Sequence, residues 1–117
     1  LASVIASHRD RGTVMLDAGG LALSKDRSTA DSDFDSGFGQ IADLSGVPLP
    51  GIRVNGVHQE HGEVRVEDPA LLATLSVGTK VRVFPNHACM TAAAYEVYNV
   101  VDGGVEVVDQ WTRCNGW

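Results

Sequence analysis

The stretch V-R-V-F-P-N-H-A-C-M-T, from Val81 to Thr91, holds both the clearest strand end and the most reactive pair of side chains in the sequence. Val81 and Val83 alternate with an arginine, as they would in a strand with one buried face. Pro85 has no N–H to donate to a neighbouring strand. We therefore expect strand pairing to end at Pro85, with the next residues on a loop.

A histidine and a cysteine two residues apart, His87 and Cys89, follow that proline. In an extended loop, side chains at positions i and i+2 point to the same side, so an imidazole nitrogen and a thiolate can bind one ion. These donors favour zinc over calcium or magnesium. A structural zinc site needs four ligands, so two protein ligands indicate a catalytic ion completed by water, substrate or residues from elsewhere. The alternative is a buried cysteine beside an unrelated histidine.

Length and composition predict one domain, residues 1–117, with a 44% hydrophobic content typical of globular chains. A net charge of -6 without a basic cluster argues against nucleic acid and against an anionic membrane surface. No run approaches the ~20 apolar residues of a spanning helix, and no secretory signal begins the chain, so we expect a cytoplasmic protein.

Cys89 and Cys114 are too few for a disulfide framework. Leu1 suggests a processed product or a piece of a longer chain.

Short runs of β-branched and aromatic residues predict seven or eight strands and an all-β fold, a mainly antiparallel barrel or sandwich. The runs are residues 1–8, 13–16, 21–24, 52–54, 63–67, 81–85, 95–101 and 105–111. The last two flank Asp102-Gly103-Gly104 and form the clearest hairpin. Asp68 before Pro69 predicts one helical turn, with an N-cap and a proline at the first helical position.

Residues 25–46 are rich in serine, aspartate and glycine, and predict a long irregular loop. Its alternating aspartates do not form a calcium loop, because serine and alanine stand where glycine and glutamate are required. Phe34 and Phe38 are expected to pin this loop to the body or to a partner chain.

A second polar cluster is H-Q-E-H-G, from His58 to Gly62. In extended backbone the two histidines point to opposite faces, so they bind one ion only where the chain bends. The helical H-E-x-x-H motif of metalloproteases is absent. Without further information, the cluster is interpreted as a polar strand end.

Three segments, in this order and spacing, resemble one family. They are D-A-G-G-L-A-L-S-K-D (Asp17–Asp26), Q-E-H-G (Gln59–Gly62) and P-N-H-A-C (Pro85–Cys89). Together they look like the C-terminal β-domain of the D-threonine aldolase and D-serine dehydratase family. The resemblance implies a homodimeric, alanine-racemase-like (fold-type III) pyridoxal-phosphate enzyme. It also implies an N-terminal α/β barrel, absent from this chain, that binds pyridoxal phosphate through a lysine.

Carried over position by position, the resemblance implies that His87 and Cys89 are the metal ligands, for Zn²⁺ or Mn²⁺. Glu60 and His61 fall near the active site with no assigned role. A cysteine ligand resembles the dehydratases, whereas aldolases of the family often carry aspartate.

We therefore expect the metal-bearing domain of a lyase that eliminates the β-hydroxyl of a D-β-hydroxy amino acid such as D-serine. One alternative is retro-aldol cleavage of the D-threonine aldolase type. An alternative of another class is a free-standing β-barrel binding module without catalysis. The isolated chain should be inactive, because Lys25 and Lys80 are its only lysines and no glycine-rich phosphate cradle accompanies them.

Overall fold

A computed structural model describes residues 1–114 of the chain. The strands are β1 (Ala2–His8), β2 (Thr13–Leu16), β3 (Gly39–Ala42), β4 (Pro48–Val57), β5 (Gly62–Arg65), β6 (Lys80–Pro85), β7 (Val97–Val101) and β8 (Val107–Thr112). The helices are α1 (Gly20–Leu23), α2 (Pro69–Thr74) and α3 (Ala88–Ala93). Within this described range, no helix is long and apolar enough to cross a membrane.

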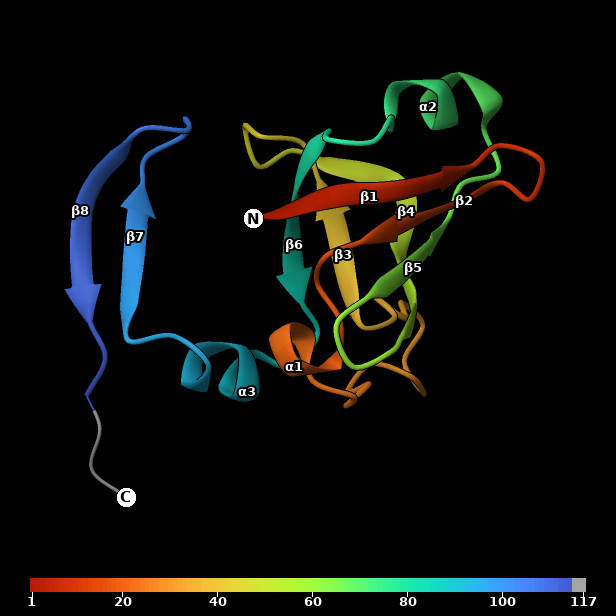
Figure 1. Ribbon diagram of the computed structural model, residues 1–117. Helices are drawn as coiled ribbons and strands as arrows, with labels where there is room; N and C mark the ends of the chain where they lie inside the picture. The colour runs from red at the N-terminus through yellow and green to blue at the C-terminus, as the bar shows by residue number, and fades with distance from the viewer. Residues whose placement is uncertain (115–117) are drawn as a thin grey trace.

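Six strands close into an antiparallel barrel in the order β1-β2-β5-β4-β3-β6, shown in Figure 1. The last strand pairs back onto the first through Ala2 with Val81 and Ser3 with Lys80. The pairing of β6 with β3 runs as far as Pro85, opposite Gly39, and ends there as predicted. The all-β prediction is confirmed, and the fold is a barrel rather than a sandwich.

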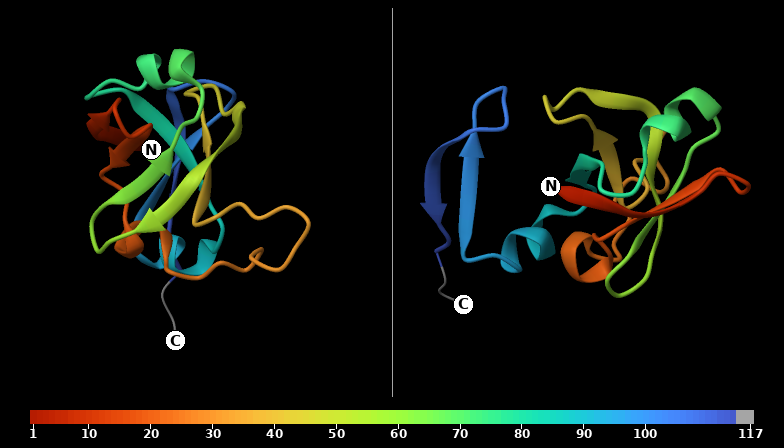
Figure 2. Two further views of the ribbon diagram at one scale, coloured as in Figure 1. Left: turned by 90° about the vertical axis from the view of Figure 1, so that its right-hand side faces the viewer. Right: turned by 45° about the horizontal axis from the view of Figure 1, so that its top comes forward.

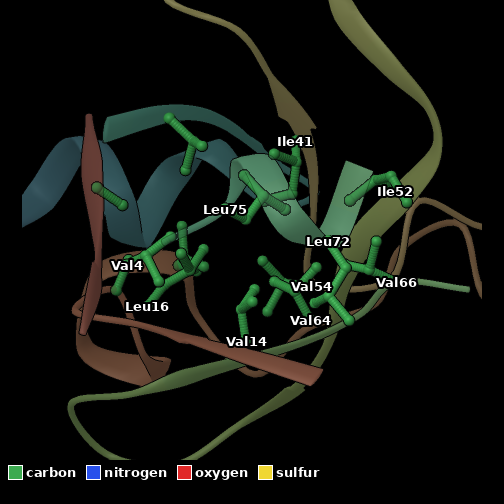
Figure 3. Close-up of a cluster of buried hydrophobic side chains, with 14 residues drawn as sticks. Val4, Val14, Leu16, Ile41, Ile52, Val54, Val64, Val66, Leu72 and Leu75 are labelled. Atoms are coloured by element: carbon green, nitrogen blue, oxygen red, sulfur yellow. The ribbon is translucent and has the colours of Figure 1, made fainter. Parts of the chain in front are cut away.

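The barrel interior is filled by aliphatic side chains from alternate strand positions (Figure 3). Leu72 and Leu75, in and just after α2, pack against this core. The predicted helical turn is confirmed: the Asp68 carboxylate accepts a hydrogen bond from the Ala70 N–H at 2.8 Å, and Pro69 is the first helical residue. The largest side chains with under 2% exposure are Leu16, Ile41, Val4, Val14, Val54, Val64 and Val66.

The predicted C-terminal hairpin is confirmed, but it forms its own two-stranded sheet outside the barrel. Figures 1 and 2 show β7 and β8 beside the barrel, joined to it through α3. The Arg82 guanidinium of β6 donates a hydrogen bond to the Gly104 carbonyl in the hairpin turn. A groove of about 580 Å³ lies between the two parts. The sequence ends on an aromatic residue, Trp117, a candidate to close a barrel or plug an interface, and Trp117 lies outside the described residues.

The prediction of a strand over residues 21–24 is wrong, because this segment forms α1. The first N–H groups of a helix have no partner within it. Here the N–H of Gly20 donates to the His58 carbonyl at 2.7 Å, and that of Leu21 to the Gln59 carbonyl at 3.1 Å. A distant turn thus stabilises a helix too short to form alone.

The predicted irregular loop over residues 25–46 contains a barrel strand, β3. A Cβ added to Gly39 would lie 2.7 Å from Val83 Cγ1 and 2.9 Å from the Phe84 oxygen. Gly39 is therefore a point of close approach between β3 and β6, not a loop signal.

Candidate metal centre

The first two family-like segments lie directly against each other at one end of the barrel. Gly19 is buried under the turn between β4 and β5, and a Cβ there would lie 2.3 Å from the His61 nitrogen. Likewise, a Cβ on Gly62 would lie 2.5 Å from the Ala18 oxygen. Both positions therefore require glycine.

The third segment joins the other two through α3, which lies next to α1 (Figure 1). The Thr91 hydroxyl donates a hydrogen bond of 2.7 Å to the Ala22 carbonyl, linking the two short helices. All three segments therefore meet around α1.

The two predicted metal ligands lie at the start of α3. His87 is the N-cap residue, with φ -118° and ψ 109°, and its side chain makes no capping hydrogen bond. Cys89 lies inside the helix, so the prediction of an extended loop is wrong for Cys89, whereas the backbone of His87 is extended. The chain turns helical directly after His87, where the pairing of β6 has ended. The thiol is exposed, and the imidazole is 31% exposed, so both are accessible.

In the part of the chain that the structure describes, the His87 ring has one charged partner: its Nδ1 lies 3.0 Å from Asp26 Oδ2. Sequence reasoning did not single out Asp26 as a site residue. It closes the first family-like segment, which was the one available signal. The contact joins residues far apart in the chain and brings a carboxylate to the proposed ligand.

The segment between α1 and β3 is held by Asn86, next to His87. The Asn86 amide donates to Thr29 Oγ1 at 2.8 Å and to the Gly37 carbonyl at 2.6 Å. The same segment therefore contacts the strand end that carries the candidate ligands.

Asp35 organises the interior of this segment. Its carboxylate accepts from the Gly37 N–H at 2.8 Å and from Arg27, and Arg53 Nη2 lies 4.0 Å away. The backbone hydrogen bond from Gly37, followed by the Arg27 guanidinium, lowers the pKa of Asp35 below its ordinary value of 3.8. These contacts give Asp35 a structural role in the segment between α1 and β3.

Glu60 and His61 are exposed on the turn between β4 and β5. A carboxylate oxygen of Glu60 accepts from Gln59 Nε2 at 3.2 Å, and the His58 N–H donates to the His61 carbonyl at 2.8 Å. The turn lies at the same end of the barrel as α1. The hydrogen bonds and ion pairs of the described residues do not join these two side chains to the His87–Cys89 pair.

The donor set fits an open site rather than a closed one. Among residues 1–114, no three histidine, cysteine, aspartate or glutamate side chains gather as metal ligands. His87 and Cys89 offer a nitrogen and a sulfur, the donors that zinc accepts, and leave other positions open.

Curated relatives match this chain along its whole length. D-threo-3-hydroxyaspartate dehydratase from Delftia sp. is 41% identical over 100% of this chain and 32% of that protein. D-serine dehydratase from Schizosaccharomyces pombe is 32% identical over 99% of this chain and 27% of that protein. The chain thus spans about a third of the length of these relatives.

Solved structures agree with the fold. An alanine-racemase-like protein from Idiomarina loihiensis superposes with a TM-score of 0.86 at 37% identity, over 99% of this chain and 31% of that one. Two mutants of D-threo-3-hydroxyaspartate dehydratase also match, with TM-scores of 0.84 and 0.82 and identities of 37% and 40%, each over 99% of this chain and 31% of that one. One replaces a cysteine and is in the metal-free form, and the other replaces a histidine two positions earlier.

The family model described as a putative serine dehydratase domain matches residues 1–101. This range contains the whole barrel, α3 and β7. The resemblance inferred from the three segments is confirmed, and the chain belongs to the putative serine dehydratase domain family.

Proposed function

We propose that this chain is the metal-holding domain of a pyridoxal-phosphate-dependent lyase that removes the β-hydroxyl of a D-β-hydroxy amino acid. His87 and Cys89 are its metal ligands, and the ion is zinc, with manganese as the alternative. The rest of the enzyme is an N-terminal α/β barrel, and the assembly is a homodimer. Cofactor attachment belongs to that barrel.

The observation that carries the proposal is the pair of accessible donors at the start of α3. The Cys89 thiol is exposed, and His87 keeps Nε2 available while Nδ1 faces Asp26. Support comes from the related dehydratase, in which a histidine and a cysteine with the same spacing were mutated and the cysteine mutant is metal-free.

The proposed chemistry assigns each donor a role. A divalent ion at this pair would polarise the substrate hydroxyl and make it a better leaving group. Cys89 would bind as a thiolate, whose negative charge offsets part of the charge of the ion, and His87 would bind as neutral imidazole. Pyridoxal phosphate would supply the electron sink for the elimination.

Cys89 also favours dehydration over aldol cleavage in this proposal. A thiolate is a softer ligand than the aspartate often found in the aldolases that this chain resembles, and it selects zinc over harder ions. The similarity to two dehydratases supports the same choice. Aldol cleavage is the second candidate, and a binding module without catalysis is the third.

Glu60 and His61 are proposed to lie beside the substrate rather than to bind the ion. Both are exposed at the end of the barrel that carries α1. Neither is assigned a proton transfer.

The test uses the complete polypeptide that contains this chain. Zinc content is measured by elemental analysis, and turnover by keto-acid release from D-serine and D-threo-3-hydroxyaspartate. We expect about one zinc per chain in the wild type. His87→Ala and Cys89→Ala should lose both zinc and turnover while the pyridoxal absorption band persists. A chelator should inactivate the enzyme without unfolding it, because an open site contributes little to folding.

Matched controls are His8→Ala and Cys114→Ala, which remove the same side chains at positions outside α3. Both should keep zinc and activity. Full turnover by metal-free protein would contradict the mechanism, and release of an aldehyde and glycine instead of a keto acid would select the aldolase alternative. Sedimentation of the same preparation tests the dimer.

A further inference from the structure

Asp26 and His87 form a pair that the proposed function does not yet explain. Asp26 Oδ2 lies 3.0 Å from His87 Nδ1, and the two side chains are 60% and 31% exposed. This separation lies in the range of an N–H···O hydrogen bond, which would need hydrogen on Nδ1 of the ring. The nitrogen on the other side of the ring, Nε2, is then the one that carries a lone pair.

Asp26 is held in place by the turn that ends α1. Ser24 is 1% exposed, and its hydroxyl oxygen accepts a hydrogen bond of 3.1 Å from the Asp26 N–H. The backbone of Ser24 also has φ +69° and ψ 166°, a conformation that residues other than glycine rarely adopt. Such a conformation persists only where the surroundings impose it. Here its N–H donates to the Gly20 carbonyl at 2.9 Å and closes the helix.

The other partner, His87, is tied to the same short helix. Thr91, one turn into α3, donates to the Ala22 carbonyl at 2.7 Å. The carboxylate and the imidazole are therefore both positioned relative to α1, one through Ser24 and the other through Thr91. Hydrogen bonds to and within α1 and its end therefore hold the backbone segments that carry both side chains.

We propose that Asp26 is a positioning residue: it fixes the His87 ring in the tautomer that carries hydrogen on Nδ1 and directs Nε2 to the metal. Histidines that bind metals usually donate their second ring N–H to a carboxylate, a carbonyl or water, which sets the tautomer and raises the basicity of the ligating nitrogen. The inference deepens the proposed function and rests on His87 being a ligand. Asp26 itself touches neither ion nor substrate.

The first test is made on metal-free protein and does not depend on zinc. In the complete polypeptide, the ¹⁵N chemical shifts of His87 report which ring nitrogen carries hydrogen when the ring is neutral. The wild type should show hydrogen on Nδ1. Asp26→Ala should shift the ring toward the Nε2–H form that free histidine prefers. An unchanged tautomer would overturn the proposal.

The second test measures zinc affinity by competition with a chromogenic chelator. Asp26→Ala should weaken zinc binding by about 10- to 100-fold, and Asp26→Asn by less, because an amide oxygen still accepts the hydrogen bond without the charge. The matched control is Asp33→Asn, which removes an exposed carboxylate from the same segment. It should bind zinc like the wild type.

The outcomes separate the two proposals. If the wild type binds zinc and Asp26→Ala binds it with the same affinity, the positioning role is overturned and the His87–Cys89 site remains. Absence of zinc binding by the wild type would overturn the proposed function itself. Because Asp26 is exposed, its replacement should leave the far-ultraviolet circular dichroism spectrum unchanged, and that spectrum is recorded for every variant.

Discussion

The barrel and the β7–β8 hairpin are built from similar residues but bury their side chains to different extents. Barrel strands turn alternate valines and leucines inward, and Val4, Val14 and Val64 are each 1% exposed. In the hairpin, every residue of β8 is exposed, including Val108 at 62% and Trp111 at 60%. The barrel thus buries its own apolar surface, whereas the hairpin shows that β-propensity alone does not create a core.

The largest expected effect of this difference is the loss of stability when a buried aliphatic side chain is truncated. Leu16→Ala should lower the free energy of unfolding by about 2–5 kcal/mol, because it leaves a cavity in the barrel. Val108→Ala in β8 should change it by less than about 1 kcal/mol. Urea unfolding of the chain measures both. Equal losses would show that the hairpin is packed as tightly as the barrel.

A second, smaller effect compares two glycines. Gly39→Ala places a methyl group 2.7 Å from Val83 Cγ1 and should cost about 1–3 kcal/mol through overpacking between β3 and β6. Gly104→Ala in the hairpin turn meets its nearest atom at 3.9 Å. It should be close to neutral in the same unfolding experiment. If Gly39→Ala proves neutral as well, the close approach of the two barrel strands is wrong.

The smallest effect concerns pH. The pKa of Asp35 is lowered in the folded chain by the Gly37 N–H and by Arg27, so its ionised form stabilises the folded state. That contribution is present above its unfolded value of 3.8 and is lost as pH falls through the folded pKa. The melting temperature should therefore fall as the pH is lowered from 6 to 2, and it should fall less in Asp35→Asn than in the wild type. Identical pH profiles would exclude this contribution.

The sequence predicted the elements whose signals are local. Runs rich in β-forming residues identified β1 and β2, and period-two alternation identified β5. An N-cap before proline identified α2, and the Asp-Gly-Gly turn identified the hairpin. Each signal depends on residues that are neighbours in the chain. The resemblance of three segments then supplied the family, which composition and spacing did not reveal.

The failures involve contacts between distant segments. The helix α1 forms because carbonyls of His58 and Gln59 accept hydrogen bonds from its first N–H groups. The sequence of residues 20–23 does not predict these contacts. The strand β3 was hidden by Gly39, whose small size serves the packing of β6.

The candidate site divides in the same way. His87 and Cys89 were identified from their chemistry, although the helix that begins between them was not. Asp26 was missed because its partner lies far away in the sequence. Side-chain chemistry is therefore readable from a sequence before the contacts that orient it.

The closure of the barrel also bears on how quickly the chain folds. Because β1 pairs with β6, the first residues of this chain form their strand pairing with residues about eighty positions later. Such a pairing carries a large loop-closure entropy and a high contact order, which slow folding. During synthesis, β6 leaves the ribosome just before His87 and Cys89, so the barrel cannot close much earlier than the candidate ligands appear. The candidate ligands therefore emerge only when all six barrel strands have been synthesised.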